Sequence, residues 1–321
     1  MTAQRPAAPD PKHLRTVAKA ILRGRVVPVL GAGANLCDRK PGEHWLRGSN
    51  LPSGAELSRW LADEFDCEVP DRDDLVRVSQ YADITNGEGA LYSELREVFV
   101  GTYPIPSLHR FLADVPALMA TGGRDPRPQL IASTNYDDLV ELALREQGVE
   151  FDVVRYVTNG PNQGLFIHER PDGGEQIIRV PNTYDDVDPD VRTVVLKIHG
   201  AVDREDESRD SYVITEDHYI EYLTRSNPSD LIPVKVLAKL VNSHMLFLGY
   251  GMRDWNLRVI LHQILAMRQV EWQSWAVQHV VDELDEKLWQ RRDVELHACG
   301  LSEYIVGLRA TLKDLAAAQP A

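Results

Sequence analysis

The chain of 321 residues has few cysteines and no long apolar run. Its three cysteines, Cys37, Cys67 and Cys299, form no C-x-x-C pair, so the sequence predicts neither a disulfide framework nor a structural zinc site. We expect ordinary packed or surface thiols. No apolar segment reaches the roughly 20 residues that a membrane-spanning helix needs, and the proline-rich N-terminus is not typical of a secretory signal. The sequence therefore predicts a cytoplasmic protein with no membrane partner.

Basic charge is also scarce. With 35 Lys and Arg against 49 Asp and Glu, the net charge is −14, and no basic cluster stands out. Because nucleic-acid binding needs a basic face, we expect no direct nucleic-acid partner. Three catalytic patterns are absent as well: G-x-x-x-x-G-K-[ST], G-x-S-x-G and H-E-x-x-H. His297 and Cys299 are too few to form a metal cluster, so no metal is expected.

What is present is an alternation of short apolar runs with helical patterns, which favours an α/β fold with a Rossmann-like, doubly wound parallel sheet. The predicted strands are Arg25–Leu30, Gln129–Ser133, Phe151–Tyr156, Thr193–Ile198, Met245–Leu248 and Ser274–Val281. The predicted helices outside the insertion described below are Asp137–Gln147, Glu216–Leu223, Asp254–Met267 and about Ser302–Ala317.

A long helical insertion separates the first two predicted strands, at about residues 53–121. Its helical patterns cover Ala55–Phe65, Asp73–Thr85, Gly89–Val100 and Ser107–Ala120, which predicts a subdomain over the sheet edge. Segments 158–174 and 182–192 are typical of loops, and they flank a short hairpin arm at 175–180. We expect a flexible tail at 1–14, one domain at 15–315 and a second tail at 316–321.

The first chemical motif is Gly31-Ala32-Gly33, which follows an apolar, β-branched run. Such a turn presents backbone amides to a phosphate. It is not the G-x-G-x-x-G dehydrogenase fingerprint, because position 36 is Leu36. Alone, the motif indicates a nucleotide-binding turn or a tight turn with no ligand.

Three further motifs also follow predicted strands. Polar residues at 133–137 can cap a helix or face a ligand, because ligands bind at the carboxyl ends of strands in doubly wound sheets. His199, followed by Gly200, is either a structural histidine or a general base. The glycine turn at 249–251, with Asp254 after it, either binds phosphate or ribose or simply turns the chain.

The order of these motifs, Gly-Ala-Gly, Thr-Asn-x-Asp, His-Gly and Gly-Tyr-Gly, resembles the sirtuin superfamily. The chain is most similar to bacterial sirtuin-like domains of antiviral NAD-depleting systems such as Thoeris. The resemblance covers roughly residues 20–270, and a weaker match follows the glycine loop at Leu51-Pro52-Ser53 and Glu56-Leu57.

The resemblance implies roles for individual residues. Asn135 would position water and ribose, His199 would be the catalytic histidine, and Asp137 would lie near the nicotinamide carboxamide. The remaining residues implied in binding NAD are Gly31, Ala32, Gly33, Asn35, Thr134, Gly249, Tyr250, Gly251 and Asp254.

The chain also departs from the family pattern. It cannot build a four-cysteine zinc module, and Thr134, Asn35 and Gly251 replace the usual Gln, Ser and Ser or Thr. The family's extended loop ending in Asp-Phe-Arg is not recognisable either, and the loss of that loop and of the zinc module weakens deacylation and favours NAD hydrolysis. The resemblance thus implies an NAD+ hydrolase that uses NAD as substrate, acts as an abortive-infection antiphage effector and is gated by a homo-oligomer or by a partner ATPase or sensor. A non-catalytic NAD or nucleotide sensor and a zinc-free NAD-dependent deacylase are the alternatives.

Overall fold

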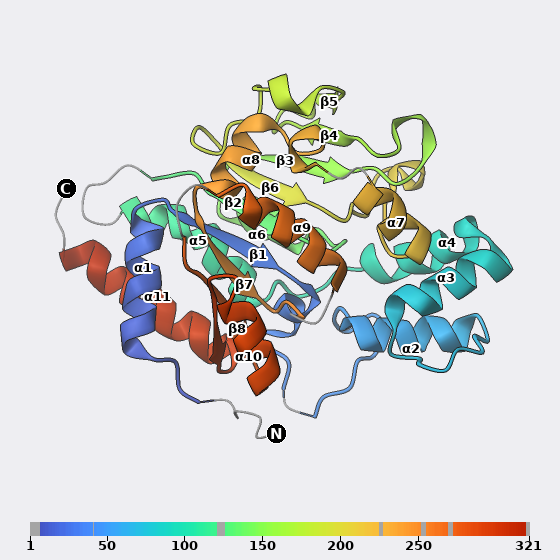
Figure 1. The fold of residues 1–321 in the computed structure, drawn as a ribbon, viewed down its shortest axis with the longest axis horizontal. Helices are drawn as coiled ribbons and strands as arrows, with labels where there is room; N and C mark the ends of the chain where they lie inside the picture. Colours follow the sequence, from blue (N-terminus) through green and yellow to red (C-terminus); the bar gives the residue numbers. More distant parts are fainter. Residues whose placement is uncertain are drawn as a thin grey trace.

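The computed structural model describes residues 7–40, 42–120, 126–224, 227–251, 255–268 and 272–318. Within these ranges the chain forms one central sheet with helices on both faces and a helical insertion to one side (Figure 1). None of the described helices is both long and apolar enough to cross a membrane.

The sheet has nine strands in the order β5-β4-β3-β6-β2-β1-β7-β8-β9. Neighbours from β3 to β9 run parallel, whereas β3-β4 and β4-β5 pair antiparallel at one edge. The strands are β1 Val26–Leu30, β2 Leu130–Ser133, β3 Phe151–Tyr156, β4 Phe166–Glu169, β5 Glu175–Ile178, β6 Thr193–Lys197, β7 His244–Leu248, β8 Ser274–Gln278 and β9 Val294–Ala298. The predicted α/β, doubly wound sheet is confirmed, with an antiparallel extension.

Strand β1 lies at the centre, between β2 and β7, so the direction of strand order reverses there. In such sheets this switch point is where ligands bind, beyond the carboxyl ends of the strands. The register aligns these ends, because one row of paired residues crosses all seven parallel strands. In spatial order the row comprises Arg155, Lys197, Ser133, Leu30, Leu248, Val277 and His297.

Helices cover both faces because residues of the buried strands alternate between two cores. Val27 and Val29 point to one core, and Val26 and Leu30 point to the other. The Val26 face packs against α1 Pro11–Leu22, α5 Ser107–Ala120, α6 Leu139–Glu146 and α11 Leu301–Ala318. The Val27 face packs against α7 Glu216–Thr224, α8 Val234–Val241, α9 Trp255–Ala266 and α10 Glu283–Gln290.

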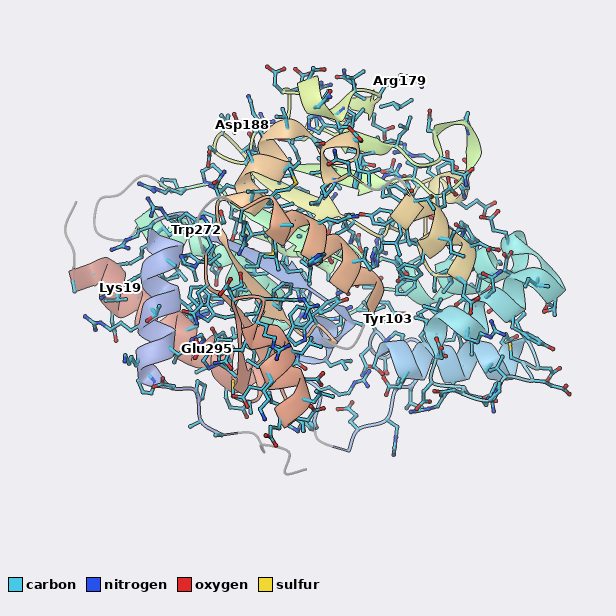
Figure 2. The ribbon with its side chains drawn as sticks, in the orientation of Figure 1. Lys19, Tyr103, Arg179, Asp188, Trp272 and Glu295 are labelled. Carbon is cyan, nitrogen blue, oxygen red and sulfur yellow. The ribbon has the colours of Figure 1, made fainter. Side chains whose placement is uncertain are left out.

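The helical insertion has a core of its own, formed by α2 Gly54–Glu64, α3 Leu75–Asn86 and α4 Glu88–Phe99. Ser53 and Glu56 start α2 with a reciprocal capping box. Figure 1 shows these helices beside the sheet, far from α1 and α11. Tyr103, labelled in Figure 2, ties the following connection back to α4 by donating to Val98 O at 2.5 Å. The fourth predicted helix of the insertion, α5, instead covers a face of the sheet.

Several elements were not predicted. Strand β4 lies within the predicted loop 158–174, and β9, α1, α8 and α10 were not identified. Helix α1 begins at Pro11, inside the predicted tail 1–14, because Asp10 accepts a hydrogen bond from Lys12 N at 3.0 Å and Pro11 suits the first turn. Helix α11 extends to Ala318, inside the second predicted tail. Both tail predictions were therefore too long.

Candidate active site

A cleft of about 1320 Å³ lies beyond the carboxyl ends of the central strands. It is lined by residues from the loops after β1, β2, β6, β7, β8 and β9 and from the helical insertion. Asp254 lies outside the described residues. The other predicted site residues all line this one cleft: Gly31, Ala32, Gly33, Asn35, Thr134, Asn135, Asp137, His199, Gly249, Tyr250 and Gly251.

The two glycine turns press against each other at the floor of the cleft. Gly33 N donates to Gly249 O at 2.8 Å, and Gly31 N donates to Leu248 O at 3.2 Å. A Cβ on Gly249 would lie 1.9 Å from Ala34 N, and φ at Gly249 is +64°. Only glycine fits such a contact and such a backbone angle. The two turns therefore contribute closely packed backbone, rather than side chains, to the cleft.

Thr134 and Asn135 join the end of β2 to the end of β1. Thr134 Oγ1 donates to Leu30 O at 3.2 Å, and Asn135 Nδ2 donates to Gly31 O at 3.1 Å. Ser133 Oγ accepts from Asn135 N at 3.1 Å, which holds the asparagine backbone in place. The amide of Asn135 is therefore oriented by the glycine turn that lies beside it.

Asp137 has two kinds of hydrogen-bond partner. Its Oδ1 accepts from Leu139 N at 3.1 Å, so it does help to cap α6. Its Oδ2 accepts from Asn35 Nδ2 at 2.8 Å, across the cleft from the first glycine turn. The Asp137 carboxylate thus caps α6 and also accepts a hydrogen bond from a cleft residue.

Buried charge lies directly beneath Asp137. Lys197 is 1% exposed, and its Nζ donates to the backbone oxygen of Asp137 and lies 3.6 Å from Glu141 Oε1. Burial raises the pKa of Glu141 against the opposing effect of Lys197. Burial also lowers the pKa of nearby His109 to about 4, opposed by Asp137 and reinforced by Lys197. Sequence reasoning missed this group, because its members come from three separate elements.

His199 lies two residues after Lys197, at the end of β6. It is 3% exposed, and the rings of Tyr219 and Tyr222 meet its imidazole edge-on at 5.5 and 6.1 Å. The next residue, Gly200, has φ of +82°, and a Cβ there would lie 2.2 Å from Ser211 O. The turn therefore needs glycine, and it sets His199 against the cleft wall.

Two parts of the cleft lining were not predicted. The first part is an apolar wall formed by the insertion together with Tyr136. The second part is a wall formed by the segment after β9. These residues are Leu57, Leu75, Phe99 and Tyr136 for the first wall, and Cys299, Gly300, Leu301, Ser302 and Glu303 for the second. The Leu51-Pro52-Ser53 match pointed towards the first wall. The second was missed with β9.

The cysteines are free and buried, as expected for ordinary packed thiols. Cys37 and Cys299 line the cleft, and burial raises the pKa of each thiol to about 11. They are therefore protonated at neutral pH and are poor nucleophiles.

A family model described as a SIR2-like domain matches residues 129–297, which is more than half of the chain. The chain belongs to the SIR2-like family. The matched range contains β2, β6, β7, β8 and all but the last residue of β9, and with them Asn135, Asp137, His199 and the second glycine turn. The resemblance inferred from four short motifs is confirmed.

Curated relatives of this SIR2-like chain carry the name NAD(+) hydrolase ThsA. The protein from Enterococcus faecium is 27% identical over 253 residues, which covers 78% of this chain and 42% of that protein. The protein from Acinetobacter baumannii is 28% identical over 223 residues, covering 68% and 37%. The chain thus spans about two fifths of the length of these relatives. A solved structure from work on the mechanism and regulation of Sir2 enzymes has a TM-score of 0.46 and 11% identity over 94% of this chain and 97% of that one.

Proposed function

We propose that the chain is an NAD+ hydrolase that cleaves the bond between nicotinamide and ribose. The observation that carries this proposal is that Asn135, Asp137 and His199 line the same cleft as both glycine turns. Relatives named as NAD(+) hydrolases over two thirds or more of this chain support the choice of substrate.

The reaction needs three kinds of group. Water adds to the ribose C1′ as the C1′–N bond breaks, giving nicotinamide, ADP-ribose and one proton. Nicotinamide leaves as a neutral molecule, so little acid catalysis is required. The barrier lies in the oxocarbenium-like ribosyl cation, as in glycoside hydrolysis. The enzyme must therefore hold the diphosphate, hold the nicotinamide and align a water molecule below C1′.

In our proposal the diphosphate lies against the glycine turns, because Gly31, Gly33 and Gly251 line the cleft and a Cβ at Gly251 would stand in open space. In our proposal Asp137 accepts a hydrogen bond from the carboxamide NH2 of nicotinamide. Asn35, which donates to Asp137 Oδ2, would set the direction of that carboxylate.

In the same proposal Asn135 orients the attacking water and the ribose hydroxyls. Its Nδ2 already donates to Gly31 O, so the amide oxygen has a fixed direction. His199 takes the proton from the water as general base, the role that imidazole plays most often. Such assistance contributes about 10²–10⁴-fold to a rate.

The test is mass spectrometry of NAD+ incubated with purified protein. We expect nicotinamide and ADP-ribose from the unaltered protein and a loss of about 10²-fold or more with His199→Ala and with Asn135→Ala. His44→Ala is the matched control, because His44 is exposed and does not line the cleft. Full hydrolysis by His199→Ala would contradict the assignment of the base. A rise in Tm with NAD+ but no nicotinamide would instead favour the sensor.

The wider setting remains a proposal from the resemblance. From it we propose a cytoplasmic protein that acts as an abortive-infection antiphage effector. An ungated enzyme would deplete the NAD+ of its own cell, so we also propose that a homo-oligomer or a partner ATPase or sensor gates the activity. Light scattering of the purified protein with and without NAD+ tests the oligomer.

A further inference from the structure

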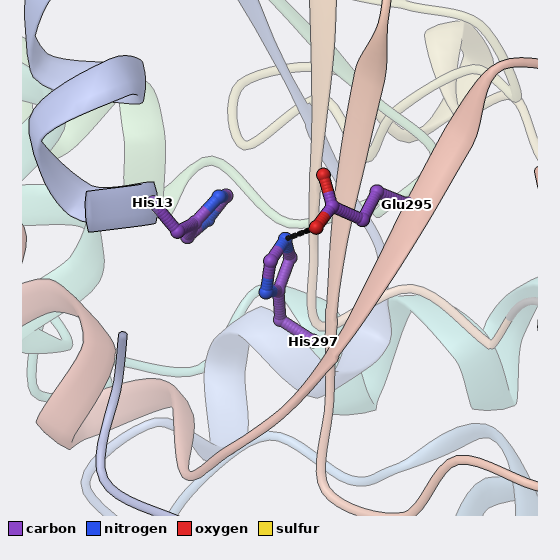
Figure 3. Close-up of side chains that lie close together, drawn as sticks. All are labelled: His13, Glu295 and His297. Carbon is purple, nitrogen blue, oxygen red and sulfur yellow. Dashed lines mark ion pairs between the residues drawn. The ribbon is translucent and has the colours of Figure 1, made fainter. Parts of the chain in front are cut away.

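A second group of side chains with metal-ligand chemistry lies where the first helix meets the last strand. His13 comes from α1, and Glu295 and His297 come from β9 (Figure 3). One ring nitrogen of each histidine and one carboxylate oxygen lie within 4.8 Å of one another. Residues 295 and 297 are two positions apart along the strand, so their side chains point to the same face of the sheet. None of the three lines the cleft.

The two imidazoles are already held together. Their rings stack with centroids 3.5 Å apart and planes 27° apart. His13 Nε2 lies 2.9 Å from Tyr304 OH, so Nδ1 is the ring nitrogen of His13 that this contact does not use. Histidines that ligate metals usually use their second nitrogen in such an outer contact. His297 Nε2 lies 3.5 Å from Glu295 Oε1 and makes no hydrogen bond within the described ranges.

We propose that His13, Glu295 and His297 bind one divalent cation of the zinc class. Two imidazoles and one carboxylate suit Zn²⁺, Co²⁺ or Ni²⁺ better than Mg²⁺ or Ca²⁺. At metal–ligand distances of 2.0–2.1 Å, tetrahedral ligand atoms are about 3.3 Å apart, so side-chain rotations must draw these three closer. The fourth position is left for water.

The bound cation would fasten α1 to β9 beside the cleft. Ala7 N, before α1, donates to Ala298 O at 3.0 Å, directly after His297. Ala7 and Cys299 both line the cleft. The cation thus holds a wall of the cleft and takes no part in NAD+ cleavage, so this inference does not depend on the proposed reaction.

The test is a Co²⁺ titration of metal-free protein that carries no histidine tag. We expect visible absorption bands of tetrahedral Co²⁺ that saturate at one equivalent and disappear when Zn²⁺ is added. A Zn²⁺ concentration one hundred times Kd should raise Tm by about 4 °C.

His297→Ala and Glu295→Gln should each weaken Co²⁺ binding at least tenfold, and His44→Ala should leave it unchanged. These two β9 positions are more exposed than His13, so they test the site even if His13→Ala fails to fold. Absence of Co²⁺ bands at millimolar concentration would overturn the proposal, and so would equal binding by His297→Ala.

Discussion

Lys197→Met probes the buried charge beneath the cleft. The substitution keeps a side chain of similar length but removes the ammonium group, which donates to the backbone oxygen of Asp137 and lies 3.6 Å from Glu141 Oε1. Removing one partner of a buried ion pair typically costs about 3–5 kcal/mol, because the other charge stays buried. Glu141 can reduce that cost by taking up a proton.

The cost of protonating Glu141 sets an upper bound on the electrostatic part of the destabilisation. Keeping Glu141 protonated at pH 7, when its unfolded-state pKa is ~4.3, costs about 3.7 kcal/mol, since each pH unit contributes about 1.4 kcal/mol. At pH 5 the same cost is about 1 kcal/mol. The folded-state pKa of Glu141 is raised. The stability that depends on its protonated form is therefore fully present below the unfolded-state pKa and is lost as pH rises towards the folded-state pKa. The destabilisation should therefore be up to about 2.7 kcal/mol smaller at pH 5 than at pH 7.

Urea unfolding followed by circular dichroism at both pH values measures the effect. The double variant Lys197→Met/Glu141→Gln is the control, because it has no carboxyl group to titrate, and we expect it to lose most of the pH dependence. A destabilisation by Lys197→Met below about 1 kcal/mol at pH 7, or one equal at both pH values, would refute the reasoning.

Two further predictions concern the cleft wall. Gly249→Ala should cost about 3 kcal/mol or more in unfolding free energy and abolish the rise in Tm with NAD+, because its Cβ would lie 1.9 Å from Ala34 N at positive φ. Gly251→Ala, which adds a Cβ in open space, should change stability by less than about 0.5 kcal/mol in the same assays. Burial alone would raise the pKa of Glu56, but hydrogen bonds led by the one from Arg39 hold it at about 2. Arg39→Gln should therefore lower stability at neutral pH and reduce the further loss on acidification from about pH 4 to pH 2, as measured by acid unfolding.

The sequence predicted six of the seven parallel strands and the loops that follow them, for a physical reason. A parallel strand buried on both faces contains a continuous apolar run, as at Val26–Leu30 and 194–196, and its end is marked by glycine or polar residues. Edge elements lack that mark. Strand β9, Val294–Ala298, mixes polar and apolar residues and was missed, although the segment directly after it lines the cleft.

Helix α1 was missed for a different reason. Its sequence carries an N-cap, Asp10, and a proline at the first helical position, which together indicate a helix start. The prolines before it suggested a tail instead. That error concealed His13, so His297 was considered only with Cys299, and the two were judged too few for a metal cluster.

What no local pattern could supply is the spatial order along the edge where the strands end. Parallel strands end on the same edge, so each strand-end motif could be placed there from sequence alone. The order β6-β2-β1-β7-β8-β9 differs from chain order, however, because β1 lies at the centre and the chain extends the sheet on both sides of it. Lys197 and His297 therefore lie on opposite sides of the glycine turns along the aligned row. This order separates the residues proposed for NAD+ cleavage from the proposed cation site, so removing the cation should lower Tm without removing the groups that act on NAD+.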